Sequence, residues 1–201
     1  PIRHSGSPAM HNAALAKLGL DWRYLAFEVS PDALGQAIDG ARTMHFVGLN
    51  LTVPHKLLAV ELVDELDESA TTWGAVNTIS FEAKNESGDW TPLGQLPGPA
   101  TDEIRAKGYN TDADAITLAL QQDLGLSLAR QRVLLLGAGG AGRVAALKLA
   151  AEGVARLHLV NRTVAKAEDL AHEIAERFPQ TKATVGYPEN IPGQIDLVLN
   201  A

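Results

Sequence analysis

Short apolar runs alternate with longer amphipathic stretches along the whole chain. Pro31 and Pro54 each suit the first turn of a helix, because a proline needs no amide partner there. In the first part the pattern predicts a helix over residues 9–18, a strand over 22–29, a helix opening at 30–32, a strand over 46–51, a helix over 54–66 and a strand over 75–81. Alternation of this kind predicts an α/β sheet with helices packed on it.

A second α/β series follows in the last ninety or so residues. It consists of a predicted helix over residues 112–124, a strand over 133–136, a helix over 141–152, a strand over 157–160, a helix over 164–178 and strands over 183–186 and 195–199. Between the two series, residues 84–107 are rich in Gly, Pro, Asn, Asp and Thr. We expect an irregular hairpin or a flexible insertion there, poorly packed and open to protease.

The strongest single motif lies between the strand at 133–136 and the helix after it. Gly137, Gly139 and Gly142 fit the pattern G-x-G-x-x-G. Such glycines let the backbone turn tightly against a pyrophosphate, and the helix N-terminus offers unpaired N–H groups to the anion. The predicted cofactor-binding residues of this turn are Gly137, Ala138, Gly139, Gly140 and Ala141. A tight turn without a ligand is the structural alternative.

The residues after the next strand indicate which dinucleotide binds. An NAD-selective site usually has Asp or Glu there, on the ribose 2′-hydroxyl. This chain has Asn161, Arg162 and Thr163, with Lys166 close behind, and therefore no carboxylate that would repel a phosphate. Arg162 can bind the 2′-phosphate as a planar fork, which predicts NADP; a solvated Arg162 beside a helix-capping Thr163 is the alternative. Asn200 and Ala201 complete the predicted cofactor site.

Polar side chains also gather at several places in the first part of the chain. Ser5 and Ser7 precede a helix, where hydroxyls and free N–H groups can hold a carboxylate, although Ser7 also suits a cap. Lys56 falls in a helix's first turn, where a lysine is usually solvated. Asp112 starts another helix, which Asp112 or Thr111 can cap.

Taken together and in this order, the polar segments and the Gly-rich turn resemble the signatures of the shikimate dehydrogenase family. The matching segments are Ser5-Gly6-Ser7-Pro8, Asn50-Leu51-Thr52-Val53-Pro54-His55-Lys56, Gly74-Ala75-Val76-Asn77-Thr78, Asn110-Thr111-Asp112 and Gly137-Ala138-Gly139-Gly140-Ala141. The resemblance covers nearly the whole chain. It implies a substrate-binding, catalytic α/β domain over residues 1–111, a Rossmann-type NADP-binding domain over residues 112–201, and an active-site cleft between them.

The resemblance implies reversible, NADPH-dependent reduction of 3-dehydroshikimate to shikimate, in aromatic amino-acid biosynthesis. It assigns the substrate carboxylate to Ser5 and Ser7, the ring hydroxyls to Thr52, Asn77 and Asp112, and acid/base catalysis to Lys56. The residue types agree with this chemistry, because an ammonium group can stabilise a developing alkoxide and supply its proton. Asp112 would orient Lys56, so we expect their side chains to lie within hydrogen-bonding or water-bridged distance.

Three features depart from the family pattern. Ala113-Asp114-Ala115-Ile116 replaces a Gly-containing turn, residues 84–107 are long for a compact hairpin, and Trp73 stands where an aliphatic residue is usual. These departures concern the mouth of the cleft rather than the reaction. We also expect the family's first strand to precede Pro1, and its last segments, with one further substrate contact, to follow Ala201, so that the Rossmann domain is truncated here.

Composition and charge exclude several classes of site and of binding partner. The chain has no cysteine, which excludes disulfides, thiolate metal sites and a cysteine nucleophile, and we expect no metal. The formal net charge is −7 without a basic stripe, which argues against nucleic acid and anionic membranes. No apolar run could span a bilayer and no signal peptide opens the chain. We therefore expect a cytoplasmic monomer or homodimer whose partner is a small anionic, hydroxylated ring.

Several alternatives stay open at this point. A quinate or quinate/shikimate dehydrogenase has the same fold, although the two serines and Arg162 argue against its NAD-linked form. Glutamyl-tRNA reductase shares a Gly-rich turn and an Asn-Arg-Thr sequence but needs a cysteine nucleophile. The chain could also be a module of a fused multi-activity protein. A cofactor-sensing relative or an inactive fragment is the non-enzyme alternative, against which the presence of both Lys56 and Asp112 argues.

Overall fold

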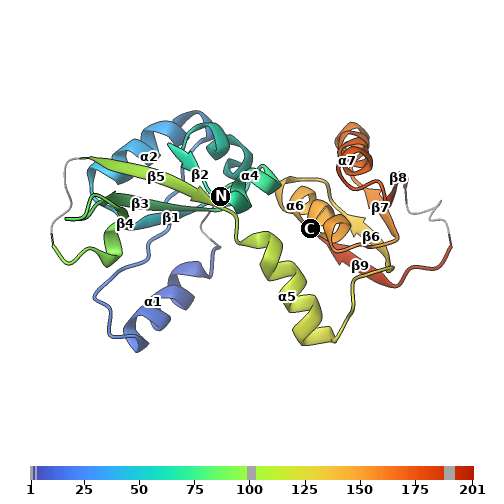
Figure 1. The fold of residues 1–201 in the computed structure, drawn as a ribbon, viewed down its shortest axis with the longest axis horizontal. Coiled ribbons are helices and arrows are strands. Elements are labelled where there is room, and N and C mark those ends of the chain that lie inside the picture. The colour runs from blue at the N-terminus through green and yellow to red at the C-terminus, as the bar shows by residue number, and fades with distance from the viewer. Residues whose placement is uncertain (1, 3, 99–102, 188–192) are drawn as a thin grey trace.

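The protein folds into two sheets that lie side by side, each with its own helices (Figure 1). The computed structural model describes residues 2, 4–98, 103–187 and 193–201. Helix α5 (Asp112–Leu124) leads from one sheet to the other. We call residues up to 111 the first lobe and residues from 112 onward the second lobe. The predicted α/β class is confirmed.

The first lobe is built on a mixed sheet with the strand order β1-β3-β5-β2 and with β4 paired to β3. Strands β1, β4 and β5 run antiparallel to β3, whereas β2 runs parallel to β5. Its core contains the fully buried side chains of Ile38, Val76, Ile79 and Phe81. The elements are α1 (Ser7–Lys17), η1 (Pro31–Ala33), α2 (Leu34–Thr43), β1 (Gly48–Asn50), α3 (His55–Leu58), η2 (Ala59–Glu61), β2 (Glu65–Leu66), α4 (Glu68–Trp73), β3 (Thr78–Lys84), β4 (Trp90–Pro92), η3 (Leu93–Gln95) and β5 (Ile104–Tyr109).

Two predicted elements of the first lobe are wrong. Residues 22–29 form no strand, because the Asn12 side chain accepts from the Tyr24 N–H (2.8 Å) and donates to the Tyr24 carbonyl (2.9 Å) in place of a neighbouring strand. The helix predicted over 54–66 ends with the short α3 and η2. Beyond them the chain turns into β2, because the N–H groups of Asp64 and Asp67 pair with carbonyls of β5.

Helix α4 was not predicted, although its ends carry ordinary signals. The Asp67 side chain accepts from the Ala70 N–H at 2.8 Å and caps the start of the helix. Gly74 ends it in the left-handed region, with φ +60°. The helix has only six residues, too short for the apolar period of a helix to show.

Residues 84–107 include strand β4 and the start of strand β5. The hairpin is present, because β4 pairs with β3. Residues 104–107, however, belong to β5, which lies between β3 and β2, and Ala106 there is fully buried. Small residues stand at alternate positions of β5, at Ala106 and Gly108. Gly108 packs closely against Val76, since a Cβ at Gly108 would lie 2.8 Å from the Val76 side chain. Residues 99–102 of this segment lie outside the described residues.

We expect amide hydrogen exchange to divide this segment in two. The Ala106 N–H donates to the Asp64 carboxylate at 2.6 Å inside the sheet, whereas Ser87 and Gly88 form only local bonds in the exposed β3–β4 turn. Exchange at Ala106 should be at least about a hundredfold slower than at Gly88, because its opening requires the sheet to separate. Residue-resolved exchange measured by NMR checks this. Equal rates at the two sites would show that β5 is not a stable strand.

The second lobe is built on a parallel sheet with the strand order β8-β7-β6-β9. Counted within the lobe this order is 3-2-1-4, which is the order found in a Rossmann fold. Its core includes the fully buried Leu135, Leu147, Leu157, Leu159 and Ile174. The predicted elements are present, with ends that differ by one or two residues. They are β6 (Arg132–Leu136), α6 (Gly140–Ala151), β7 (Arg156–Val160), α7 (Val164–Arg177), β8 (Lys182–Val185) and β9 (Leu197–Asn200).

An ion pair ties β6 to the residue before β9 and makes the stability of this lobe depend on pH. Arg132 donates from Nε and Nη2 to both carboxylate oxygens of Asp196, at 2.8 and 2.6 Å. These hydrogen bonds lower the pKa of Asp196 from 3.8 to about 2. Because the folded-state pKa is below the ordinary value, the pair stabilises the fold at neutral pH, and the contribution is lost as the pH falls from 3.8 to about 2.

Asp196→Asn should therefore lower the free energy of unfolding at neutral pH and have little effect at a pH below about 2, where the parent carboxylate is itself mostly protonated. Denaturant unfolding at both pH values measures the difference. Asp123→Asn on α5, exposed and outside this pair, is the matched control. A destabilisation of equal size at both pH values would contradict a role for the charge of Asp196.

Candidate active site

Lys56 and Asp112, predicted from separate segments, form a direct ion pair. Lys56 lies in α3, just after β1, and Asp112 is the first residue of α5, just after β5. The Lys56 Nζ donates to Asp112 Oδ2 at 2.8 Å. Their side chains are only 13 % and 26 % exposed, so Lys56 is not the solvated lysine of the structural alternative. The expected approach of the two side chains is confirmed.

Two asparagines hold Asp112 in place. The Asn77 Nδ2 donates to Asp112 Oδ1 at 2.8 Å, so both carboxylate oxygens are bonded. Asn110, which is buried, accepts from the N–H groups of Asp112 (3.1 Å) and Ala113 (3.3 Å) and donates to the Ala75 carbonyl (3.0 Å). Thr111 is the N-cap residue of α5, as one of the two alternatives had it, but its side chain makes no capping bond. The Asn110 side chain binds the first N–H groups of the helix instead, which leaves the Asp112 carboxylate free for Lys56. Asparagine before a helix was itself the signal for this role.

Lys56 is also fixed through its backbone. Its carbonyl accepts from the Val76 N–H at 2.8 Å, which ties α3 to the segment that leads into β3. At the preceding residue of α3, His55 Nε2 lies 3.1 Å from the Val29 carbonyl. Two segments that are distant in the sequence therefore hold the turn that carries Lys56.

A chain of hydrogen bonds continues from Asn77 to the start of the first lobe. Thr78 donates to Asn77 Oδ1 (3.0 Å), and Asn50 donates to Thr78 Oγ1 (3.1 Å). The Tyr24 hydroxyl donates to Asn50 Oδ1 at 3.2 Å, and its ring stacks on His11 with centroids 4.3 Å apart. Burial raises the pKa of Tyr24, which keeps this hydroxyl a donor. The sequence does not indicate that Tyr24 binds Asn50, because it predicts a strand over residues 22–29.

The Gly-rich turn has the geometry that a bound pyrophosphate requires. Gly137 adopts φ +113°, and a Cβ there would lie 2.2 Å from the Ala201 carbonyl oxygen. A Cβ at Gly142 would lie 2.2 Å from the Gly137 carbonyl oxygen. Gly139 faces open space, and α6 begins beside it with no side-chain cap and no acidic residue in its first turn. The start of α6 is therefore free to receive an anion.

The residues after β7 divide into one that supports this turn and several that face solvent. Asn161 accepts from the Ala138 N–H (3.1 Å) and donates to the Thr163 carbonyl (2.8 Å), so it fastens the two loops together. Thr163 is the N-cap residue of α7 but makes no side-chain capping bond. Arg162 and Lys166 are exposed, and neither forms an ion pair within the part of the chain that the structure describes.

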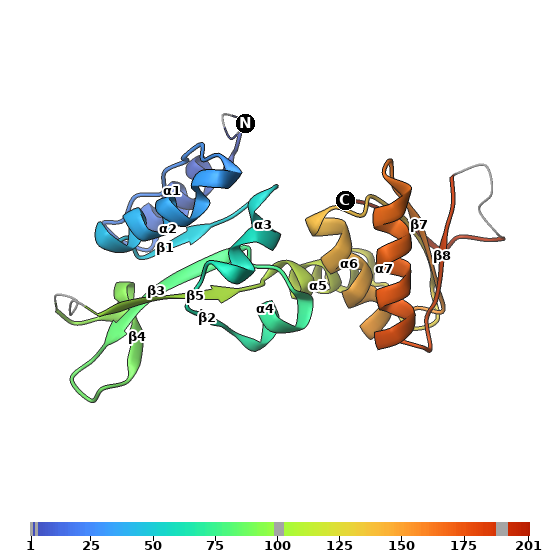
Figure 2. The same ribbon diagram turned by 90° about the horizontal axis from the view of Figure 1, so that it is seen from above.

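A pocket of about 410 Å³ brings the ion pair and the Gly-rich helix together. Figure 2 shows α3 opposite the start of α6, and a Cβ built on Gly140 would lie 4.0 Å from the Lys56 Cβ. The backbone at Ala201 reaches the same place, because its N–H donates to the Leu136 carbonyl at 2.9 Å. The pocket is lined by Lys56, Asp112, Ala115, Ile116, Ala119, Ala141, Ala145, Leu199, Asn200 and Ala201.

The predicted carboxylate-binding serines are not among the residues that line this pocket, and neither is Thr52. Gly6 is the N-cap residue of α1 and Ser7 its first residue, so the structural alternative, in which Ser7 caps the helix, is wrong. The Ser5 hydroxyl instead accepts from the Ser7 N–H at 3.3 Å. Thr52 is exposed, and its carbonyl accepts from the His55 N–H.

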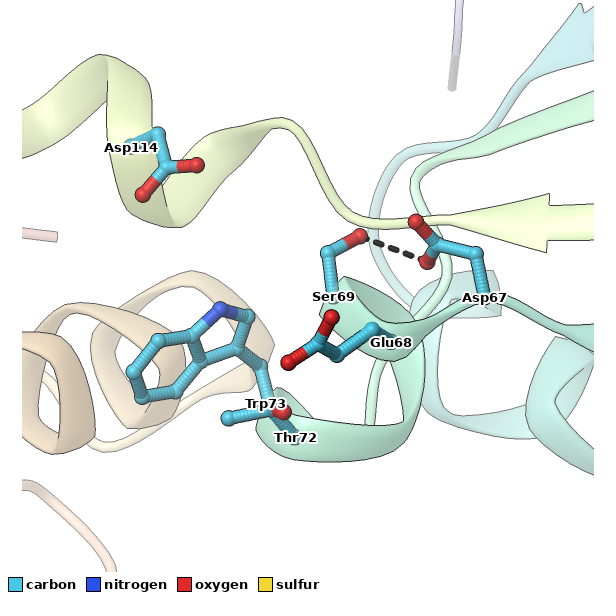
Figure 3. Close-up of a pocket in the computed structure, with 6 residues that line it drawn as sticks. All are labelled: Asp67, Glu68, Ser69, Thr72, Trp73 and Asp114. Carbon is cyan, nitrogen blue, oxygen red and sulfur yellow. Dashed lines mark hydrogen bonds between the residues drawn. The ribbon is translucent and has the colours of Figure 1, made fainter.

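A second hollow of about 350 Å³ lies between α4 and α5 (Figure 3). Asp67, Glu68 and Asp114 line it, together with Ser69, Thr72 and Trp73. Asp67 is engaged as the cap of α4 and accepts from the Ser69 hydroxyl at 2.6 Å. Carboxylates repel an anionic substrate or dinucleotide, so the candidate active site is the pocket that contains Lys56.

Within residues 2, 4–98, 103–187 and 193–201, no group of three His, Asp or Glu side chains is placed to hold a metal ion. None of the helices in these ranges combines the length and the apolar character needed to cross a bilayer.

Comparison with known proteins identifies the family of the chain. Residues 1–79 match the family described as the shikimate dehydrogenase substrate binding domain, and residues 118–193 match the family described as shikimate / quinate 5-dehydrogenase. The NADP(+) shikimate dehydrogenase of Methanopyrus kandleri is 40% identical over 186 residues, which are 92% of this chain and 57% of that protein.

Solved structures give the same result. A crystal structure of a shikimate dehydrogenase in complex with NADP+ has a TM-score of 0.80 and 36% identity, covering 100% of this chain and 63% of that one. The shikimate dehydrogenase of Aquifex aeolicus has a TM-score of 0.78 and 32% identity, covering 100% of this chain and 65% of that one. This chain thus spans about three-fifths of the length of these relatives. It belongs to the shikimate dehydrogenase family.

Proposed function

We propose that this protein is an NADP-dependent shikimate dehydrogenase, which reversibly reduces 3-dehydroshikimate to shikimate. The observation that carries the proposal is the single pocket shared by the Lys56–Asp112 pair and the start of the Gly-rich helix. An acid/base pair and a dinucleotide-binding turn that open into one space are what a hydride-transfer enzyme needs. The related proteins named above have this activity in their names.

NADP fits the residues of the second lobe. Its pyrophosphate would lie at Gly137, Ala138, Gly139, Gly140 and Ala141, where the backbone leaves room and α6 starts uncapped. Its 2′-phosphate would lie between Arg162, Thr163 and Lys166, with Asn161 holding that loop against the turn. Asn200 and Ala201 would flank the nicotinamide, which when bound supplies or accepts the hydride. The proposed domain division falls between residues 111 and 112.

Lys56 moves the proton. In the reductive direction its ammonium group donates a hydrogen bond to the carbonyl oxygen of the substrate and then a proton to the forming alkoxide. In the oxidative direction the neutral amine takes the hydroxyl proton. Asp112 keeps the lysine aimed at this oxygen, since its own position is fixed by Asn77 and Asn110.

The remaining polar side chains would bind the ring. Asn77 and Asp112, already hydrogen-bonded to each other, would share donors and acceptors with neighbouring ring hydroxyls, and Thr52 would add another. Ser5 and Ser7, beside the start of α1, would bind the carboxylate. A site of hydroxyl and amide groups suits a small polar anion better than an apolar slot would.

The test is oxidation of shikimate by the purified protein, followed through the absorbance of NADPH. We expect turnover of shikimate with NADP. The kcat/KM should be at least about tenfold lower when NAD replaces NADP or when quinate replaces shikimate, because a site built to hydrogen-bond its ligand discriminates against compounds that lack the matching group. No turnover with any of these combinations would overturn the proposal. Preferred turnover of quinate with NAD would assign the protein to the other branch of the family.

A further inference from the structure

Two arginines of the second lobe hold the end of a first-lobe helix. Arg143, on α6, donates from Nη1 to the carbonyl of Trp73, the last residue of α4. Arg177, on α7, donates from Nη2 to the carbonyl of Thr72 at 2.7 Å. We refer to Arg143, Arg177 and Glu173, the carboxylate that joins them, as the brace.

Glu173 organises the brace from the next turn of α7. It accepts from Arg143 Nε at 3.1 Å and Nη2 at 2.6 Å, and from Arg177 Nη1 at 2.8 Å. All three side chains are one-quarter to one-third exposed, and Arg143 and Glu173 form a two-bond fork. Such geometry distinguishes the brace from single, fully exposed ion pairs, which contribute little. Cations are also the favoured partners of the last carbonyls of a helix.

The Trp73 side chain makes an apolar contact at the same place. Trp73 is buried, and it packs in the hydrophobic cluster of the second lobe although it belongs to the first. Figure 3 shows its indole projecting from the end of α4 below Asp114. Lys148 of α6 lies 5.7 Å from the ring centroid and forms an ion pair with Asp114 at 3.0 Å. The tryptophan that departs from the family pattern is therefore part of the contact between the lobes.

The segment that the brace holds is the one that positions the catalytic pair. Gly74 follows Trp73 directly, and a Cβ there would lie 3.1 Å from Arg143 Nη1. Val76, two residues further, bonds to the Lys56 carbonyl, and Asn77 bonds to Asp112. Trp73, which Arg143 binds, is thus only three residues from Val76 and four from Asn77.

On the other side, the brace holds the helix of the Gly-rich turn. Arg143 lies one turn of α6 after Gly140, and Gly140 is the residue that faces the Lys56 Cβ. One side chain therefore links the start of the cofactor helix to the segment that positions the proton donor. A shift of α6 relative to α4 changes the distance between the nicotinamide position and Lys56.

We propose that the Arg143–Glu173–Arg177 brace positions the two halves of the active site, setting the cofactor-binding turn at its reactive distance from Lys56. Its effect on turnover rests on the proposed dehydrogenase activity, whereas its effect on the arrangement of the lobes does not. None of the three residues touches the reacting atoms, so each is a positioning residue rather than a catalytic one.

Glu173→Ala and Arg177→Ala test the kinetic consequence. Each ligand binds mainly to its own lobe, so the dissociation constants of NADP and of shikimate, measured separately, should stay within about twofold of the parent values. The kcat should fall about tenfold or more, because hydride transfer depends steeply on the distance between reacting groups. Glu176→Ala, also on α7 but in an exposed pair with His172, is the matched control and should leave kcat unchanged. Unchanged kcat in both brace variants would overturn the proposal, and so would a loss of ligand binding in step with kcat.

A second measurement is independent of activity. The chain has no cysteine, so nitroxide labels can be placed at two exposed sites, Asp39→Cys in the first lobe and Lys182→Cys in the second. We expect one narrow distribution of spin–spin distances in the parent and a clearly broader one in Glu173→Ala. The same distribution in both would refute the brace. A broader distribution in a protein whose parent does not oxidise shikimate would support the brace while the proposed function fails.

Discussion

Replacement of Lys56 by alanine is expected to lower the kcat of shikimate oxidation by about a hundredfold or more, the usual contribution of a general acid/base. The Lys56 Nζ is the cationic group nearest the pocket and is held 2.8 Å from Asp112. Alanine leaves the Asp112 carboxylate in place, since Asn77 and Asn110 still bind this residue. The developing alkoxide then has neither a proton donor nor a positive charge beside it. Steady-state kinetics with NADP measures the loss.

Two further variants separate the roles of Lys56. Lys56→Arg keeps the positive charge but replaces the ammonium group with a guanidinium, which does not give up a proton in proteins, so its kcat should also fall by more than about tenfold. Lys182→Ala, at an exposed lysine of β8, is the control for loss of a lysine and should keep the parent kcat. Thermal unfolding should show that all variants are folded. A near-normal kcat in folded Lys56→Ala would show that another group moves the proton.

The second lobe could be predicted from the sequence almost residue by residue. Its strands are continuous apolar runs such as Val133 to Leu136, and its helices are long enough to show a helical period. The glycines at 137 and 142 mark close backbone contacts that no other residue allows, so they fix the turn between strand and helix. Local pattern and tertiary packing agree in this lobe.

The first lobe was predicted less well because its elements depend on distant partners. Residues 22–29 have the apolar content of a strand, but the Asn12 side chain binds the backbone at Tyr24 in place of a neighbouring strand. β2 is only two residues long, and its pairing with β5 cannot be seen from either segment alone. β5 was hidden in a segment judged by its Gly and Pro content, although alternate small residues run through it.

The candidate site could likewise be predicted only in part from the sequence. Resemblance to the family brought Lys56, Asn77 and Asp112 together, and the fold places them in one hydrogen-bonded group. The brace was invisible in the sequence, because Arg143 and Glu173 look like ordinary polar positions on helices. Their function depends on how two lobes meet, which no local pattern records.

Replacement of Arg162 by alanine should weaken binding of NADP(H) by about tenfold to a hundredfold, which corresponds to loss of about 1.5–3 kcal/mol for a charged hydrogen-bonded pair. Binding of NAD(H) should change by less than about twofold, because NAD has no 2′-phosphate for the guanidinium to bind. Arg162 is exposed, beside the N-cap of α7, and has no ion-pair partner among the described residues. Its removal therefore leaves no buried charge behind, and the fold should be unaffected.

The control for this variant lies at the start of β7, the strand that precedes Arg162. Arg156→Ala removes an exposed arginine from the opposite end of β7, away from the Gly-rich turn, and should leave the affinity for both cofactors unchanged. Titration of each protein with NADP and with NAD gives the four dissociation constants that are needed. An equal loss for both cofactors in Arg162→Ala would mean that this residue supports the loop rather than the phosphate. Selectivity for NADP would then have to come from Lys166 and Thr163, two other exposed polar residues at the start of α7.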